Sequence, residues 1–234
     1  MTNSPKKPAN TPAPRPKLAA TIILLREDKG APQVLLGKRS IRHDFMPSIY
    51  VFPGGRVDPA DTYAPSSDHL NTRTREILEA ALPPARARAC ALAAVRETFE
   101  ETNLILGNPE QYEGPAINDP SWKAYFKHGY TPAISGIEVC GRAITPPTRP
   151  KRFDTWFFVA KLGEAAANQP IKKTAELVDI GWYHLDAVKD LEMHRITKIM
   201  LSEATKFLGR EHHPNSVLFS RMIRKTFKFS QFPQ

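Results

Sequence analysis

The sequence predicts an α/β domain in which helices pack against a mixed sheet. Six short segments are rich in β-branched and aromatic residues and are separated by turn signals, as strands are. Several other stretches repeat their apolar residues at helical spacing. The 234 residues suffice for one well-buried domain, and no apolar run approaches the length needed to span a membrane.

The elements are expected in a mixed order along the chain. The predicted strands cover residues 19–25, 34–38, 50–52, 137–144, 153–161 and 178–184. Helices are predicted over 85–102, 119–127 and 195–208, with one further short helix between 69 and 82 that begins at a capping Asp or Ser. Helices that alternate with strands in this way favour layers packed on a sheet.

The helix over 85–102 places three carboxylates close together. It is rich in Ala, lacks Gly, and begins after Pro83 with a second proline in its first turn. Glu97 lies three and four residues before Glu100 and Glu101, so the three side chains share one face. They form either a solvated acidic face or a site for a hard divalent cation, which removes their mutual repulsion.

A turn upstream favours the metal site. Phe52-Pro53-Gly54-Gly55 allows a tight loop whose backbone approaches other groups closely, and Asp61 follows six residues after Gly55. With Arg96-Glu97 and Glu100-Glu101, this pattern resembles the Nudix box, GX5EX7REUXEEXGU, in which U is aliphatic. Asp61 stands where the family has Glu, and Asn103 stands where it has Gly. Asn is the second choice for a left-handed helix end.

The two halves of the box are separated by an insert. Asp61 and Arg96 have 34 residues between them, where the box has seven, so 27 are extra. Residues 62–84 read as a helical insert that either is a neutral surface insertion beside the box helix or forms a lid or wall of the site.

A split box of this kind is similar to one Nudix subgroup, the motif-19 type of coenzyme A diphosphatase. The segments before the box and at Arg152-Phe153-Asp154-Thr155 also look like that subgroup. The resemblance implies a Nudix α/β/α sandwich with a mixed sheet, an insert inside the box, and Mg²⁺- or Mn²⁺-dependent hydrolysis of a diphosphate linkage in a nucleoside diphosphate derivative.

The site residues expected from the resemblance and from side-chain chemistry fall into three groups. Glu97, Glu100 and Glu101 are the expected metal ligands. Glu100, Glu101, Arg96 and Glu176 are the expected catalytic residues, with Arg96 orienting Glu100 and the general base left open. The expected substrate-binding residues are Arg39, Arg42, Gly54, Gly55 and Arg152.

Some of these side chains have a structural alternative. Asp154 can pair with Arg152 and make both structural. Phe45 and Trp156 either stack on a base or pack in the core. Glu176 is either a functional carboxylate or an ordinary loop residue.

The net charge of +9 lies mostly at the two ends of the chain. We expect a disordered basic tail over 1–17, a Nudix domain over 18–208 and a basic, aromatic extension over 209–234. The extension either stacks bases of a nucleic acid, or docks on the domain or on a second subunit. A homodimer is therefore one open alternative.

The two cysteines fit neither a metal motif nor a disulfide framework, which favours a reducing compartment. Residues 18–25 read as a strand rather than a secretory signal, prolines disfavour a mitochondrial presequence, and the final residues are no peroxisomal address. The expectation is a cytoplasmic protein without a membrane span.

The sequence is compatible with three functions. The leading one is hydrolysis of coenzyme A or acyl-coenzyme A to 3′,5′-ADP and a phosphopantetheine. The second is an ADP-ribose or nucleoside-diphosphate-sugar pyrophosphatase. The third is a non-catalytic protein of the same fold that binds a nucleotide or RNA through its basic ends.

Overall fold

The computed structural model describes residues 13–41, 47–115, 117–208 and 213–233. The strands are β1 (Lys17–Asp28), β2 (Ala31–Arg39), β3 (Tyr50–Val51), β4 (Gly54–Arg56), β5 (Gly107–Asn108), β6 (Thr131–Pro132), β7 (Glu138–Ile144), β8 (Phe153–Lys161), β9 (Leu177–His184), β10 (Val217–Ile223) and β11 (Thr226–Phe232). The helices are α1 (Thr72–Glu79), α2 (Pro84–Thr102), α3 (Pro120–Phe126), α4 (Glu164–Ala167) and α5 (Arg195–Thr205), with 3₁₀ turns η1 (Pro59–Thr62) and η2 (Ala187–Asp190).

One large mixed sheet organises the described chain. Its order is β11-β10-β7-β8-β1-β2-β3, and β4 and β9 branch from β1 and β2. The long strand β1 runs parallel to β8 along one side, while its other side pairs first with β4 and then with β2. The short strand β4 therefore ends up beside the middle of the sheet, where α2 crosses it.

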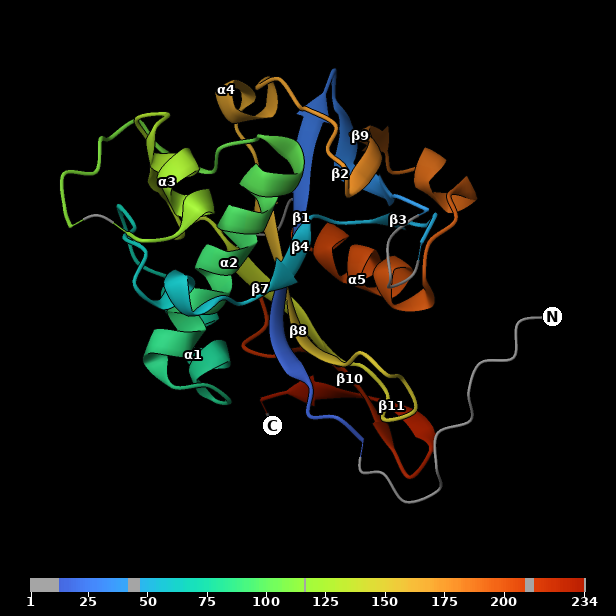
Figure 1. The fold of residues 1–234 in the computed structure, drawn as a ribbon. Coiled ribbons are helices and arrows are strands. Elements are labelled where there is room, and N and C mark those ends of the chain that lie inside the picture. Colours follow the sequence, from blue (N-terminus) through green and yellow to red (C-terminus); the bar gives the residue numbers. More distant parts are fainter. Residues whose placement is uncertain (1–12, 42–46, 116, 209–212, 234) are drawn as a thin grey trace.

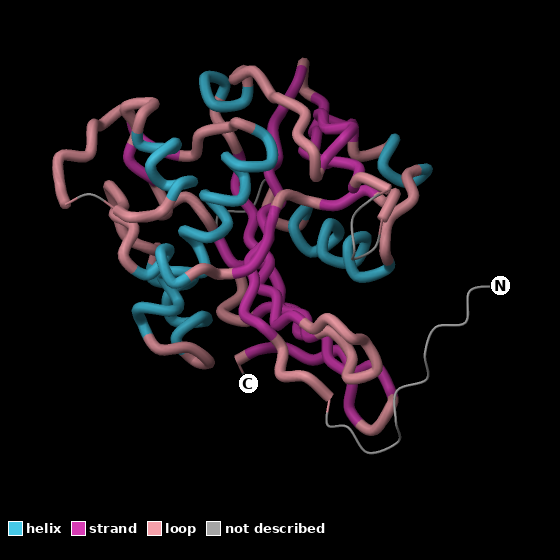
Figure 2. The backbone as a smooth tube through the Cα atoms, viewed as in Figure 1, coloured by secondary structure: helices cyan, strands magenta, loops and turns pink. Residues whose placement is uncertain are grey.

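Helices cover both faces of this sheet, as Figures 1 and 2 show. The face with α1, α2 and α3 encloses one hydrophobic core, and the face with α5 and η2 encloses the other. The buried side chains of β1 alternate between the two cores, with Ile22 and Leu24 against α2 and Ile23 and Leu25 in the core of α5. The predicted α/β sandwich with a mixed sheet is confirmed.

The predicted elements of the domain are present with small shifts at their ends. All six predicted strands are found, and the helix predicted over 85–102 spans Pro84–Thr102. The helix predicted over 195–208 ends earlier, at Thr205. At the end of α2, Asn103 adopts the expected left-handed conformation with φ of 63°.

The insert contains one short helix, as expected, but its cap is different. The side chain of Asn71 accepts a hydrogen bond from the Thr74 N–H and so begins α1; the expected Asp or Ser cap is wrong. Asp68 instead accepts from the backbone N–H groups of Ile134 and Ser135. The insert is therefore fastened to the loop before β7.

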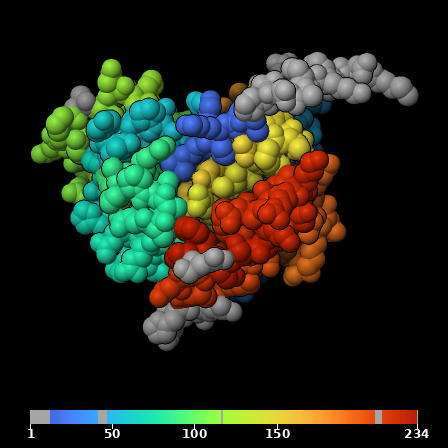
Figure 3. Space-filling model, turned by 90° about the horizontal axis from the view of Figure 1, so that it is seen from below, coloured from blue at the N-terminus to red at the C-terminus, as the bar shows by residue number. Residues whose placement is uncertain are grey.

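The C-terminal segment forms a β-hairpin that extends the sheet. β10 runs parallel to β7, and β11 returns antiparallel to β10 as an edge strand. Figure 3 shows this hairpin (red) spread across one face of the molecule, beside the loop near residue 150 (yellow). Phe227 and Phe229 remain 48% and 42% exposed, whereas Phe232 packs against Trp156.

In the part of the chain that the structure describes, no helix has the length and apolar character needed to cross a membrane.

Candidate active site

The C-terminal half of α2 lies against the turn that contains Gly54 and Gly55. The Gly54 N–H donates a hydrogen bond of 3.0 Å to Oε2 of Glu101. A Cβ atom at position 55 would lie 2.4 Å from the Glu97 carboxylate. The second glycine is thus required by the close approach of backbone and carboxylate.

Gly54 has its own reason to be glycine. It pairs with Thr21 on β1 and has a φ of +156°, where a Cβ atom would meet the Ala20 carbonyl oxygen at 2.5 Å. The central strand thus holds the glycine turn, and the turn holds the carboxylates of α2. Residues 33 to 47 positions apart in the sequence thus meet at this turn.

Arg96 connects the carboxylates to a buried anchor. Its Nη1 donates to Glu97 at 2.9 Å and to Glu100 at 2.8 Å, as the expected orienting role for Glu100 requires. Its Nε and Nη2 donate to the two oxygens of Asp61 at 2.8 and 3.1 Å. Burial lowers the pKa of Arg96, but the hydrogen bonds and charges of its carboxylate partners outweigh this effect and leave the pKa above its ordinary value.

Asp61 is fully buried and held from three sides. Besides Arg96, it accepts from the Asp58 N–H at 2.8 Å and from the indole N–H of Trp122 at 3.0 Å. Asp61 thus acts as an anchor for Arg96. The sequence does not indicate this role of Trp122, on α3, because a single tryptophan 61 positions away has no spacing that links it to Asp61.

Burial shifts the pKa values of two carboxylates on α2. Burial raises the pKa of Glu97 to about 7, with Arg96 opposing the shift and the charge of Glu100 adding to it. Burial and the charge of Glu97 raise the pKa of Glu101 well above its ordinary value, although the Gly54 hydrogen bond opposes this. Such perturbed carboxylates beside each other are typical of functional sites.

Arg39 and Glu176 lie close to this pair. Burial lowers the pKa of Arg39, while the charges of Glu101 and Glu176 oppose the shift. The two segments are joined where the Ser40 N–H donates to the Glu176 carbonyl at 2.9 Å. Hydrogen bonds between Thr174 and Leu177 close the turn that presents Glu176. The structure thus brings both predicted residues to the carboxylates of α2.

Other predicted residues lie elsewhere. The guanidinium of Arg152 donates to the carbonyls of Thr145 and Pro14, and no contact among the described residues joins it to the α2 carboxylates. Asp154 forms its ion pair with Arg142, at 2.6 and 2.8 Å, so the alternative in which it pairs with Arg152 is wrong.

Trp156 is fully buried below Arg142, so base stacking by its ring is wrong and core packing is correct. Arg42 and Phe45 lie outside the described residues.

The insert does not cover the carboxylates. The helix α1 packs against α2 and β7, and Figure 1 places it at the end of α2 opposite to the Glu97–Glu101 turn. Arg73 reinforces this position by donating to Glu138 and to the Val139 carbonyl. Of the two alternatives for the insert, this placement favours the surface insertion.

The carboxylates on α2 are suited to a hard divalent cation that binds only a few protein groups. Within the described ranges, no three Asp, Glu, His or Cys side chains are gathered around one point as a metal cage would be. Glu97 and Glu101 do interact closely, and both present carboxylate oxygens. Two carboxylates with remaining positions for water and phosphate match the coordination that Mg²⁺ prefers.

Comparison with known sequences finds diphosphatases. The chain is 35% identical over 114 residues to the acyl-coenzyme A diphosphatase NUDT19 of Gallus gallus, covering 38% of this chain and 30% of that protein. It is 25% identical to NUDT19 of Xenopus laevis over 70% of this chain and 56% of that protein. The chain spans about half or less of the length of these curated relatives. No family model matches it.

Comparison with solved structures finds the same fold. A Nudix hydrolase from Alicyclobacillus acidocaldarius aligns with a TM-score of 0.59 and 24% identity, covering 82% of this chain and 92% of that one. The Nudix domain of Shewanella oneidensis NrtR, solved with ADP ribose, aligns with a TM-score of 0.50 and 15% identity, covering 83% and 90%. The chain therefore has the Nudix fold, and its predicted resemblance to Nudix coenzyme A diphosphatases is confirmed.

Proposed function

We propose that this chain, which has the Nudix fold, is a divalent-metal-dependent hydrolase of the diphosphate bond in coenzyme A or acyl-coenzyme A. The products would be 3′,5′-ADP and a phosphopantetheine or its acyl form. The observation that carries the reaction class is the hydrogen bond from the Gly54 N–H to Glu101, which holds this buried carboxylate against the glycine turn.

Mg²⁺ or Mn²⁺ would be held by Glu97 and Glu101, with Glu100 as a third ligand. A bound ion of this kind polarises a phosphoryl oxygen and lowers the pKa of a coordinated water. The chain's own contribution is to keep these carboxylates in place, which Arg96 does from its buried anchor.

The remaining residues would position the substrate and the attacking water. Arg39 offers a planar fork that matches phosphate oxygens and lies within electrostatic reach of Glu101. Glu100, Glu101 and Glu176 are the three candidates for the base that takes the proton from the water. Glu176 stands on the turn closed by Thr174 and Leu177, where its charge acts on Arg39 and Glu101.

Coenzyme A as substrate rests on the relatives, two of which are named acyl-coenzyme A diphosphatases. The runner-up is an ADP-ribose or nucleoside-diphosphate-sugar pyrophosphatase, and one structural neighbour is a Nudix domain complexed with ADP ribose. A nucleotide- or RNA-binding protein without turnover is the alternative of another class. Arg42 remains a proposed phosphate contact, whereas the guanidinium of Arg152 is engaged with the carbonyls of Thr145 and Pro14. A cytoplasmic location and a homodimer remain predictions.

The test is turnover across a panel of free coenzyme A, acyl-coenzyme A, ADP-ribose, UDP-glucose and capped RNA, with Mg²⁺ or Mn²⁺. Products are separated by chromatography. We expect selective release of 3′,5′-ADP, and we expect Glu101→Gln to lower turnover by about 10²- to 10⁴-fold, as loss of an acid–base group does. The exposed Glu79 on α1 supplies the matched control, Glu79→Gln.

Preference for ADP-ribose or UDP-glucose would replace the substrate and keep the reaction class. Absence of turnover with every compound and both metals would reject the enzyme. Salt-sensitive RNA retention that survives Glu101→Gln would then support the binding protein.

A further inference from the structure

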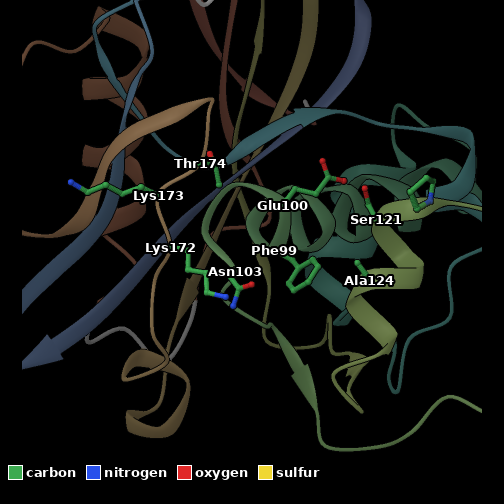
Figure 4. A pocket seen from close by; sticks show the side chains of 9 residues that line it. Phe99, Glu100, Asn103, Ser121, Ala124, Lys172, Lys173 and Thr174 are labelled. Atoms are coloured by element: carbon green, nitrogen blue, oxygen red, sulfur yellow. The ribbon is translucent and has the colours of Figure 1, made fainter.

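A pocket opens beside Glu100, between α2, α3 and the loop before β9. Its volume is about 430 Å³, within the range of small-molecule sites. The last turn of α2, the first turns of α3 and the loop before β9 form its walls, as Figure 4 shows. The lining residues are Phe99, Glu100, Asn103, Pro120, Ser121, Ala124, Lys172, Lys173 and Thr174.

The walls of this pocket differ in chemistry. Phe99, Pro120 and Ala124 provide apolar surface between α2 and α3. Lys172 and Lys173 provide two exposed cations on the opposite wall, and neither takes part in an ion pair among the described residues. Glu100, on the α2 side of the pocket, contacts Arg96 at 2.8 Å, and the same guanidinium also pairs with Asp61 and Glu97. The pocket therefore offers an apolar wall facing a positive one.

The position of the loop is fixed although its lysine side chains are not. The Lys172 N–H donates to the Thr102 carbonyl at 2.9 Å and so ties the loop to the end of α2. In Figure 4 Lys172 lies beside Asn103, whereas Lys173 extends away from α3. Exposed lysine side chains change rotamer within nanoseconds, so both ammonium groups can turn toward a bound anion.

We infer that this pocket binds the 3′-phosphorylated adenosine arm of the substrate, with the base on the apolar wall and the 3′-phosphate at Lys172 and Lys173. The inference rests on the proposed function, because it takes the scissile diphosphate to lie at Glu97 and Glu101. Glu100 lines the pocket and lies on the same turn of α2 as Glu97 and Glu101, and for this reason the adenosine side of the diphosphate is placed in the pocket. Among the small-molecule diphosphates of the panel, only coenzyme A and its acyl forms carry a 3′-phosphate, which makes the lysine wall a selectivity element.

The first test compares coenzyme A with 3′-dephospho-coenzyme A. We expect the wild type to prefer coenzyme A, and we expect Lys172→Ala/Lys173→Ala to lower the ratio of the two kcat/KM values by about tenfold, equivalent to about 1.4 kcal/mol. Turnover of the dephosphorylated substrate should change little. The control is Lys225→Ala/Lys228→Ala, which removes the same charge from the exposed C-terminal hairpin and should leave the ratio unchanged.

The second test needs no turnover. Calorimetry in EDTA measures binding of 3′,5′-ADP and of 5′-AMP to the same three proteins. We expect tighter binding of 3′,5′-ADP by the wild type and by the hairpin control, and loss of that preference in the pocket variant. Loss of this preference only in the pocket variant supports the inference even if coenzyme A is not hydrolysed, in which case the proposed function alone fails.

Two outcomes would overturn the inference while the proposed function stands. One is hydrolysis of coenzyme A with a substrate ratio that the pocket variant leaves unchanged. The other is an equal loss for both substrates, which would place the lysines at the diphosphate or at the pantetheine arm. If the wild type binds 3′,5′-ADP no better than 5′-AMP, the pocket assignment is likewise rejected.

Discussion

Arg96 and Asp61 form a buried two-point ion pair, with N–O distances of 2.8 and 3.1 Å, across 34 intervening residues. The insert leaves and returns without disturbing this contact, because α1 packs against α2 and β7 rather than between the partners. The two halves of the split motif are thus rejoined through one carboxylate and one guanidinium. A bidentate pair of this kind gives fixed geometry as well as energy.

Removal of the anchor should destabilise the protein strongly. Asp61→Asn leaves the charge of Arg96 without its buried partner, and breaking such a pair costs about 3–5 kcal/mol. The free energy of unfolding is measured by urea titration. The control is Glu27→Gln, which breaks the exposed pair with Lys161 and should cost at most about 1 kcal/mol. Equal effects of the two substitutions would contradict the role of Asp61.

The indole N–H of Trp122 should contribute separately from the packing of its ring. Trp122→Phe removes the 3.0 Å donor to Asp61, and loss of a hydrogen bond to a charged group costs about 1.5–3 kcal/mol beyond the change in packing. Trp156→Phe is the matched control, because Trp156 is equally buried and its indole N–H has no partner among the described residues. Comparison of the two unfolding free energies isolates the hydrogen bond; a smaller loss for Trp122→Phe would argue against it.

The acidity of Glu97 should make the metal-free protein less stable at high pH. The carboxyl has a pKa of about 7 in the folded state and about 4.5 in the unfolded state. As the pH rises between these values, the unfolded chain ionises first, so stability falls, by a total of about 3 kcal/mol above pH 7. Glu97→Gln in EDTA should therefore be the more stable protein at pH 8 and lose this advantage near pH 4.

Thermal unfolding at the two pH values measures this difference, with Glu79→Gln as the exposed control. Added Mg²⁺ should reverse the order at pH 8, because only the wild type retains the carboxylate ligand. A Glu97→Gln protein that is less stable than the wild type at pH 8 in EDTA would contradict the prediction.

The space at Gly55 should be indispensable for activity. Gly55→Ala places a methyl group 2.4 Å from the Glu97 carboxylate, which must move. A misplacement of about 1 Å in a catalytic group costs roughly 10²-fold in rate, so kcat/KM should fall by about that factor. Gly163→Ala, at a position with open space around the added methyl group, is the control and should leave kcat/KM unchanged. An unchanged kcat/KM in Gly55→Ala would show that activity does not depend on the position of the Glu97 carboxylate.

Local patterns sufficed for the parts of the site that are close in sequence. The carboxylates at 97, 100 and 101 share a face because the residues from Pro84 to Thr102 form a helix, as their composition indicates. The left-handed Asn103 follows from the same helix end. The alternation of apolar residues along β1 also anticipates a strand with a core on each face.

Local sequence patterns did not predict the C-terminal hairpin. Arg224 and Lys225 form its two-residue turn with φ of 48° and 65°, a conformation for which Gly and Asn are the usual signals. Without those residues the turn was not anticipated, and 217–232 read as a basic extension. Pairing of β10 with β7 outweighs the local cost of the turn, and that gain exists only in the folded domain.

The chain of amino acids alone thus determines the fold class, the acidic helix face and the glycine turn, because each depends on neighbours within about ten residues. Tertiary structure alone decides which groups those residues meet. It pairs Arg96 with Asp61, adds Trp122, gives Asp154 to Arg142, and brings Glu176 and Arg39 toward Glu101. Each of these contacts joins residues that are far apart along the chain, so helical or strand periodicity cannot predict it. The partner is determined by which hydrogen-bonding group lies within reach in the folded protein.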